Sequence, residues 1–213
     1  MFPRTNNRKA ISAVLTTMII LVASVVLGTG VVLYGTSLFQ TNAQAEGIAT
    51  QGVKMWVNST DANNVAWGAA GVRNTGDRLV SVDTIQVRGT TIPFSNWYVD
   101  TSTTRVTNSN FQSQFNFTKN DSNGLLKGYI VTGNCAGVSG TVIGIDEDGA
   151  GANPTLCLQQ QSGPVSLNPG AKIIVYFKVP NGILRPVDSG ATTGVNIFAG
   201  KTGAPTSVTV GNP

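Results

Sequence analysis

The longest uncharged run of the chain constrains its structure most. From Ile11 to Ala45 there is no Asp, Glu, Lys or Arg, and the next charge is Glu46. A membrane-spanning helix needs roughly 20 apolar residues, so this run is long enough to cross a bilayer. It has no polar face, and a helix that is apolar all round must be buried on every side, in lipid or among other helices. We therefore predict a hydrophobic assembly or transmembrane helix over residues 11–45.

The flanks of this run predict its orientation. A secretory signal has an apolar core of only about 7–15 residues, which is shorter than the run seen here. Arg4, Arg8 and Lys9 precede the run, and basic residues beside a span stay on the cytoplasmic side of the membrane. The sequence therefore predicts that residues 46–213 lie outside the cytoplasmic membrane.

The composition excludes several classes of function. The 213 residues include no His and 2 Cys, which excludes Ser-His-Asp and Cys-His catalysis, histidine metal sites and four-thiolate zinc sites. The formal net charge is +4, but 3 of the 14 basic residues lie in the first nine positions, which leaves 11 basic against 10 acidic residues. The rest are scattered, without the pattern typical of nucleic-acid binding. We expect no enzyme, no cofactor and no nucleic-acid partner.

The residues Arg8-Lys9-Ala10-Ile11-Ser12, directly before the uncharged run, resemble the class III signal of archaeal type IV pilin-like proteins. The resemblance implies that a class III signal peptidase removes residues 1–10 by cutting between Ala10 and Ile11. Lys9, Ala10 and Ile11 would then form the processing site, and the helix would remain in the mature protein. Bacterial type IV pilins carry a glutamate at the fifth mature position, where this chain has Leu15. Ser12 before an apolar run is closer to archaeal adhesion-type pilins than to most archaellins, the subunits of the motility filament.

Residues 46–213 are predicted to form one extracellular β domain. Runs typical of strands cover 53–57, 65–72, 79–87, 111–118, 125–131, 138–145, 172–179, 195–198 and 208–210. Turn signals lie between them, at 74–77, 123–124, 168–170 and 180–182. About seven to nine short strands separated by turns are typical of an immunoglobulin-like β-sandwich. We therefore expect an α+β chain, with a long N-terminal helix followed by an all-β sandwich.

Two cysteines and an acidic cluster are candidates for chemistry in this domain. Cys135 and Cys157 lie 22 residues apart, and a cysteine pair in an exported domain normally forms a disulfide. The alternative is two free buried thiols. Between them Asp146, Glu147 and Asp148 offer carboxylate oxygens of the kind that bind calcium. Their spacing does not match a twelve-residue calcium loop, so we expect a solvated loop and no metal.

Three sequons and a group of aromatic residues complete the candidates. Asn58, Asn116 and Asn120 each begin an Asn-x-Ser/Thr triplet, the acceptor motif for N-glycosylation. Asn116 falls inside a strand pattern. The aromatic residues Trp56, Trp67, Trp97 and Tyr98 could form a carbohydrate platform, but large aromatics in sandwiches usually belong to the core, which we expect here.

The resemblance implies the function of the chain. We expect a structural subunit of an extracellular archaeal type IV pilus with a role in adhesion, polymerising with identical subunits through its N-terminal helix. The class III signal peptidase and a membrane assembly machinery would be its other partners, and the subunit would sit in the cytoplasmic membrane before assembly. The alternatives are an archaellin and a monomeric membrane-anchored extracellular binding domain.

Overall fold

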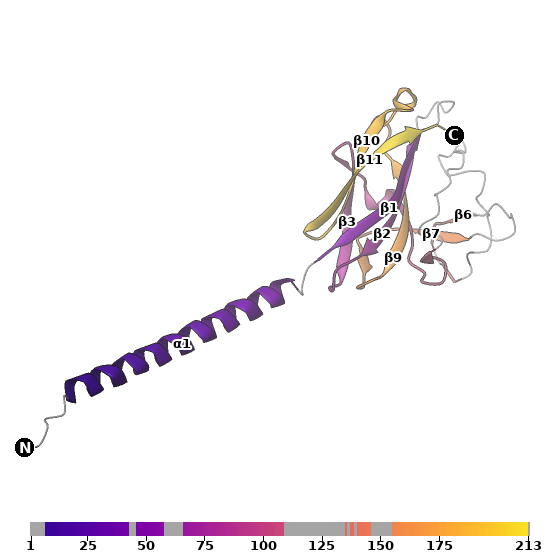
Figure 1. Cartoon of the computed structure of the whole chain (residues 1–213). Helices are drawn as coiled ribbons and strands as arrows, with labels where there is room; N and C mark the ends of the chain where they lie inside the picture. The colour runs from indigo at the N-terminus through magenta and orange to yellow at the C-terminus, as the bar shows by residue number, and fades with distance from the viewer. Residues whose placement is uncertain are drawn as a thin grey trace, which may run out of the picture. The chain divides into compact units, whose positions relative to one another are not determined.

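The computed structural model describes residues 7–42, 46–57, 66–108, 135, 137–138, 140–145 and 155–212. The chain divides into two compact units, residues 1–45 and residues 46–213. The boundary falls at Glu46, the first charged residue after the uncharged run. The first unit contains one helix and the second a β-sheet, so the α+β class is confirmed (Figure 1).

The helix α1 runs from Asn7 to Asn42 without interruption. It begins four residues earlier than predicted, because the polar residues Asn7, Arg8 and Lys9 continue the helix toward the N-terminus. The described helix reaches Asn42, and the last three residues of the predicted one, 43–45, lie outside the described residues. Residues Ile11–Phe39 form a segment long and apolar enough to cross a membrane.

The described part of the second unit contains an eleven-stranded sheet, in which ten strands follow one path of hydrogen-bonded neighbours and the eleventh lies off that path. The strands are β1 (Ile48–Val57), β2 (Ala66–Asn74), β3 (Val80–Val87), β4 (Thr90–Thr91), β5 (Trp97–Asp100), β6 (Val142–Ile145), β7 (Leu156–Gln160), β8 (Val165–Leu167), β9 (Lys172–Val179), β10 (Thr192–Ala199) and β11 (Thr202–Gly211). The path runs β4-β3-β10-β11-β1-β2-β9-β5-β7-β6, and β8 pairs with β3. All pairs are antiparallel except β1 with β11, which are parallel and meet at Met55 and Trp56.

The main core contains residues from both halves of this path, β3 and β10 in one half and β2 and β9 in the other. Alternate residues of β2 and β9, such as Val72 and Val175, share one apolar cluster with Ile85 of β3 and Ile197 of β10. Gly68 of β2 lies in the tightest place, since a Cβ there would come within 2.4 Å of the Phe177 ring and 2.5 Å of Met55 Sδ. A larger residue at position 68 would therefore force these two side chains apart.

The side chains on the opposite face of β2 and β9 form a second apolar cluster. Trp67 of β2 and Tyr176 of β9 alternate with the residues of the main core and pack with Ile145 of β6 and Leu156 of β7. Both faces of β2 and β9 are therefore buried, which explains why these strands are apolar at almost every position instead of at every second one.

Two turns form as their residues predict. Asn168-Pro169-Gly170 closes with a 2.9 Å hydrogen bond from the amide of Ala171 to the carbonyl of Asn168. Gly170 has the positive φ of 74° that a type II turn requires. In the turn after β2, the side chain of Asn74 is fully buried, and its amide nitrogen donates to the carbonyls of Arg78 and Leu167 at 2.7 and 2.9 Å.

The predicted strands agree with the structure except in short or irregular places. The structure adds β4, β5, β7 and β8, none of which the sequence predicts. It limits the predicted strand 138–145 to β6, and extends the two C-terminal ones into β10 and β11. The predicted strands 111–118 and 125–131 lie outside the described residues. The immunoglobulin-like arrangement of the strands stays a prediction.

Candidate functional site: the apolar helix and the disulfide region

The helix α1 presents apolar side chains on all sides. Large side chains around its whole circumference, from Ile11 to Phe39, are exposed in the single chain. Leu27, for example, keeps 69% of its surface exposed and Leu33 keeps 70%. A continuous apolar surface of this length is not stable in water, so it requires lipid or other helices around it.

The polar side chains of the helix do not interrupt this surface. The hydroxyl groups of Thr16, Ser24 and Thr29 donate to backbone carbonyls three or four residues earlier, at 2.7–3.1 Å. Thr17 and Thr36 do the same. These hydroxyls have partners within the helix itself, so they can enter an apolar environment without losing a hydrogen bond.

Small residues recur on one face of the helix, where Ile20 and Val31 stand between them. Ala13, Thr17, Ser24, Gly28 and Gly35 follow one another at intervals of four or seven residues, which places them on the same face. The helix continues through all of its glycines. Apart from its chain neighbours and the adjoining backbone of the helix, a Cβ at Gly28 or Gly35 would meet no atom within 4 Å. Packing within the chain therefore does not require glycine at these positions.

The predicted processing site lies inside α1. Lys9, Ala10 and Ile11 all have helical backbone in the full-length chain, and Ile11 is the first residue of the apolar segment. The side chain of Ile11 is exposed. The peptide bond between Ala10 and Ile11 therefore marks the boundary between the polar start of the helix and its apolar part.

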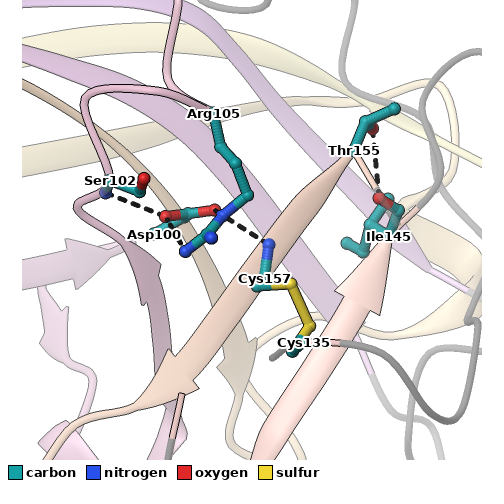
Figure 2. Close-up of a disulfide and its surroundings, with 7 residues drawn as sticks. All are labelled: Asp100, Ser102, Arg105, Cys135, Ile145, Thr155 and Cys157. Atoms are coloured by element: carbon teal, nitrogen blue, oxygen red, sulfur yellow. Dashed lines mark hydrogen bonds and ion pairs between the residues drawn. A yellow bond between two sulfur atoms is a disulfide. The ribbon is translucent and has the colours of Figure 1, made fainter. Parts of the chain in front are cut away.

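The predicted disulfide is confirmed. Cys135 and Cys157 are linked with a Cα–Cα distance of 5.6 Å, and no described cysteine is free (Figure 2). Cys157 lies in β7, which pairs with β5 on one side and with β6 on the other. The disulfide thus attaches Cys135 to a strand that is held in the sheet on both edges.

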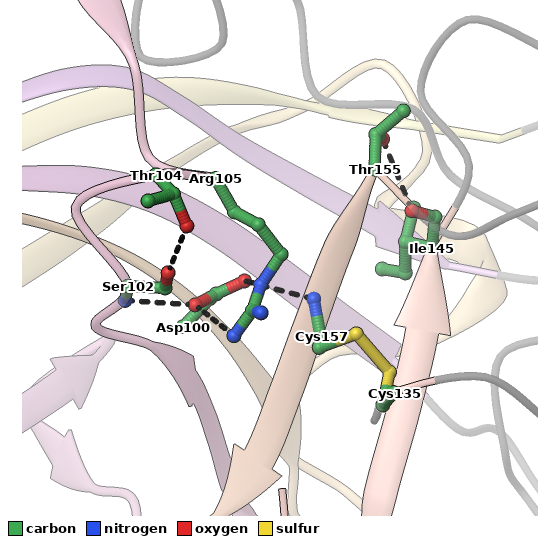
Figure 3. Close-up of polar contacts among 8 residues, drawn as sticks. All are labelled: Asp100, Ser102, Thr104, Arg105, Cys135, Ile145, Thr155 and Cys157. Carbon is green, nitrogen blue, oxygen red and sulfur yellow. Dashed lines mark hydrogen bonds and ion pairs between the residues drawn. A yellow bond between two sulfur atoms is a disulfide. The ribbon is translucent and has the colours of Figure 1, made fainter. Parts of the chain in front are cut away.

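An ion pair with a buried carboxylate adjoins the disulfide. The carboxylate of Asp100, at the end of β5, is 1% exposed and receives two hydrogen bonds from the Arg105 guanidinium, at 2.7 and 3.1 Å (Figure 3). It also accepts the backbone N–H of Ser102 at 2.9 Å and that of Cys157 at 2.8 Å.

The role of the Asp100 carboxylate is structural, because its hydrogen-bonding capacity is used within the domain. A carboxylate has about four acceptor positions, and here four donors occupy them. No position remains for taking a proton from a substrate. The interactions instead join the loop after β5 to the strand that carries the disulfide. The sequence analysis missed Asp100 and Arg105, because neither lies in a recognisable motif.

The aromatic residues belong to the core, as predicted. Trp67 and Trp97 are fully buried, and Trp56 and Tyr98 nearly so. Trp67 and Tyr98 pack with their ring centroids 5.7 Å apart, and burial raises the pKa of the Tyr98 hydroxyl above its ordinary value. These rings are not accessible as a carbohydrate platform.

The other predicted sites lie outside the described residues. This holds for the sequon asparagines Asn58, Asn116 and Asn120, and for the calcium candidates Asp146, Glu147 and Asp148. Among the residues that the structure describes, no group of three or more acidic or cysteine side chains could hold a metal ion.

Comparison with known proteins adds no relative. No protein-family model and no curated protein matches this chain.

Proposed function

We propose that the protein is a structural subunit of an extracellular archaeal type IV pilus that takes part in adhesion. The observation that carries the proposal is α1, a helix of 36 residues whose segment Ile11–Phe39 has apolar side chains on every side, followed by a separate β domain. In the proposed filament these helices pack together in a central bundle, and the β domains form the outer wall.

Assembly would be driven by packing of the helices. Helices in lipid gain little from apolar contact itself, so they associate where small residues allow close approach. The face formed by Ala13, Thr17, Ser24, Gly28 and Gly35 supports this type of contact. A contact between different faces of identical subunits that does not close into a ring produces a helical filament.

The outer domain is proposed to be an immunoglobulin-like sandwich. Its antiparallel strands, the core shared between β2/β9 and β3/β10, and the parallel pairing of its first and last strands support this arrangement. The disulfide supports an extracellular location, since disulfides persist in oxidising compartments. The proposed role is structural, and the fully occupied carboxylate of Asp100 supports it.

Electron microscopy of material sheared from cells, combined with mass spectrometry of the subunit, tests this proposal. We expect filaments whose subunits begin at Ile11 and lack residues 1–10. Replacing Lys9 with Glu should leave unprocessed subunits in the membrane, whereas Lys9→Arg, which keeps the charge, should be processed normally. Filaments that retain Met1 would contradict the proposed processing.

The same experiment separates the alternatives. A membrane-anchored binding domain would keep residues 1–10 and form no filaments. An archaellin would form filaments that are required for swimming. Cells that lose pili but still swim after deletion of this protein would support the pilus over the archaellum.

A further inference from the structure

One aromatic side chain of the β domain takes no part in its core. Among the aromatic residues that the structure describes after Glu46, Phe198 alone neither belongs to an apolar cluster nor packs against the main core. Its neighbours on β10, Ile197 and Ala199, are both in the main core. Because successive side chains of a strand point to opposite faces, Phe198 lies on the outer face of the sheet. It is half-buried there.

Two rows of residues cross this outer face, each from β3 through β10 to β11. One row consists of Thr84, Phe198 and Gly203, and the other of Gln86, Asn196 and Pro205. Residues opposite each other on neighbouring strands have side chains about 4.5–5.5 Å apart. The rows are two residues apart along each strand, which is about 7 Å. These six residues therefore form one continuous patch, which we call the Phe198 face.

The two amide side chains of the Phe198 face have no hydrogen-bond partner among the described residues. Gln86 and Asn196 lie opposite each other and are both half-buried, but neither side chain bonds to a described residue. The other half-buried amides of the described domain do have partners. Asn96, Gln160 and Gln161, for example, each donate to a backbone carbonyl. An amide group has two donors and one acceptor oxygen, so Gln86 and Asn196 have unused capacity for an outside partner.

The surroundings of the Phe198 face limit what that partner can be. β10 pairs with β3 along one edge and with β11 along the other, so no peptide can add to it as a further strand. The two rows contain no charged residue. Asp83, Arg88 and Lys201 flank them in sequence, and the Arg88 guanidinium already binds the Asp188 carboxylate and the Ile183 carbonyl. A neutral ligand held by side chains fits this face.

We propose that the Phe198 face binds a neutral polysaccharide made of extended, β-linked hexose units. A hexose ring has an apolar face of C–H groups and an edge of hydroxyl groups, which both donate and accept hydrogen bonds. Phe198 packs on the C–H face, and Gln86 and Asn196 bond to the hydroxyl groups. The binding needs only the single domain, while the view of this polysaccharide as the target of adhesion rests on the proposed function.

Gly203 keeps the ring of Phe198 in place. A Cβ at Gly203 would come within 2.7 Å of Cδ1 of this ring, so the ring occupies the space above the glycine. Cover of a strand glycine by an aromatic neighbour stabilises a sheet, which accounts for the ring but not for the two unpaired amides beside it. The same contact orders the ring before a ligand arrives, and such ordering lowers the cost of binding.

Calorimetric titration of the full chain, in a detergent without a sugar headgroup, tests the site. The probe is cellohexaose, a neutral β-linked chain of glucose. The comparison ligand is hexagalacturonate, an anionic chain of the same number of sugars. We expect cellohexaose to bind at least about tenfold more tightly than hexagalacturonate, a difference of about 1.4 kcal/mol.

Three variants locate the binding. Phe198→Leu keeps an apolar side chain over Gly203 but removes the aromatic ring, and it should weaken cellohexaose binding by about tenfold. Gln86→Ala removes one amide and should weaken binding by about threefold or more. The control Thr192→Ala, on the outer face of β10 but six residues from Phe198, should change the affinity by less than about twofold. The thermal unfolding midpoint is measured for each variant, and Gln86→Ala decides if Phe198→Leu is unstable.

Four results would overturn the inference. Cellohexaose does not bind, or hexagalacturonate binds more tightly, which would make the assigned ligand class wrong. Unchanged affinity in both Phe198→Leu and Gln86→Ala would locate the binding elsewhere. Self-association of subunits that Phe198→Leu abolishes would assign the face to a second copy of the chain. Because all of these measurements use single subunits, the proposed pilus, which electron microscopy tests, would stand in each case.

Discussion

At the scale of single residues, Asn74 links three parts of the β domain. Its side-chain nitrogen donates to Arg78 and Leu167, and its oxygen accepts the N–H of Gly76 at 2.9 Å. The residue is fully buried, so each of these bonds would be costly to lose. The turn signal at 74–77 locates the turn from sequence, but the partner Leu167 is 93 residues away and could not be predicted from local pattern.

The variant Asn74→Asp should destabilise the domain strongly. The new oxygen would face the carbonyls of Arg78 and Leu167, which are acceptors, so two hydrogen bonds would become repulsive contacts. Leaving buried polar groups unpaired costs about 1–3 kcal/mol each, and we expect a total loss of about 2–5 kcal/mol in the free energy of unfolding. Denaturant unfolding of the subunit measures it. Asn181→Asp, the same exchange at an exposed position, is the control and should change stability little.

Asp188 makes the loop around Val187 sensitive to acid. The hydrogen bond from Arg88 and that from the Arg185 backbone lower the pKa of the Asp188 carboxyl below its ordinary value. A lowered pKa in the folded state means that the carboxylate stabilises the fold above the ordinary value of about 3.9. That contribution is lost as the pH falls through the lowered pKa.

Hydrogen exchange of the loop amides measures this effect. The amides of Ser189 and Ala191 bond to Pro186 and Asp188 within the loop. At neutral pH they should exchange faster in Asp188→Asn than in the unmodified protein, and the difference should shrink below about pH 3.9. A difference that stays constant down to pH 2 would show that the ion pair does not hold the loop.

At the scale of elements, the sequence predicts long regular segments and misses short buried ones. The helix is evident from its lack of charge. The strand β3 is evident from alternation, because one face lies in the core and the other is partly exposed. Trp97–Asp100 is buried at all four positions, so it has no alternation, and four residues are too few to distinguish a strand from a loop.

The sequence predicts only residues 208–210 of β11, and the reason is different. It contains Gly203 and Pro205, residues that normally argue against a strand. Pro205 is opposite Asn196 of β10, while β1 pairs with β11 only farther on, at Val210 and Gly211. Pro205 lies outside the β1–β11 pairing, so its missing N–H removes no bond from that pairing. The bridge between Asp100 and Cys157, 57 residues apart, depends on tertiary structure in the same way.

The small-residue face of α1 gives a prediction at this scale. Gly28→Leu adds a side chain at a position where a Cβ meets no atom beyond its own stretch of helix within 4 Å, and leucine favours helix over glycine by about 1 kcal/mol. Helix content in detergent should therefore stay the same or rise, while filament yield should fall because the new side chain keeps neighbouring helices apart. Val26→Leu, on the opposite face, is the control. Normal assembly of Gly28→Leu would show that helices do not meet at this face.

At the scale of the whole molecule, the two units have separate sources of stability. The β domain has two apolar clusters, a disulfide and a partly buried ion pair, all formed by residues after Glu46. The apolar surface of α1 has no such internal partner, since its large apolar side chains from Ile11 to Phe39 are exposed in the single chain. Folding of the domain and burial of the helix should therefore be separable by truncation and by substitution.

A chain truncated to residues 46–213 should be soluble, folded and unable to polymerise. It keeps β1 from its first residue and the contact between Glu46 and the Lys201 amide at 3.3 Å, so its thermal unfolding midpoint should match that of the domain in the full chain.

In the full chain, Val25→Asp places a carboxylate in the middle of α1, where it has no partner. An acid at the centre of a span costs about 2.5–3.5 kcal/mol even before assembly. Because every subunit of a filament would carry this cost, we expect loss of filaments, with the domain still folded. Val25→Leu, which keeps the helix apolar, should assemble normally. The measurement is electron microscopy of all three proteins beside the unmodified chain. Filaments built by residues 46–213 alone, or by Val25→Asp, would make the helix a simple tether and favour a membrane-anchored binding domain.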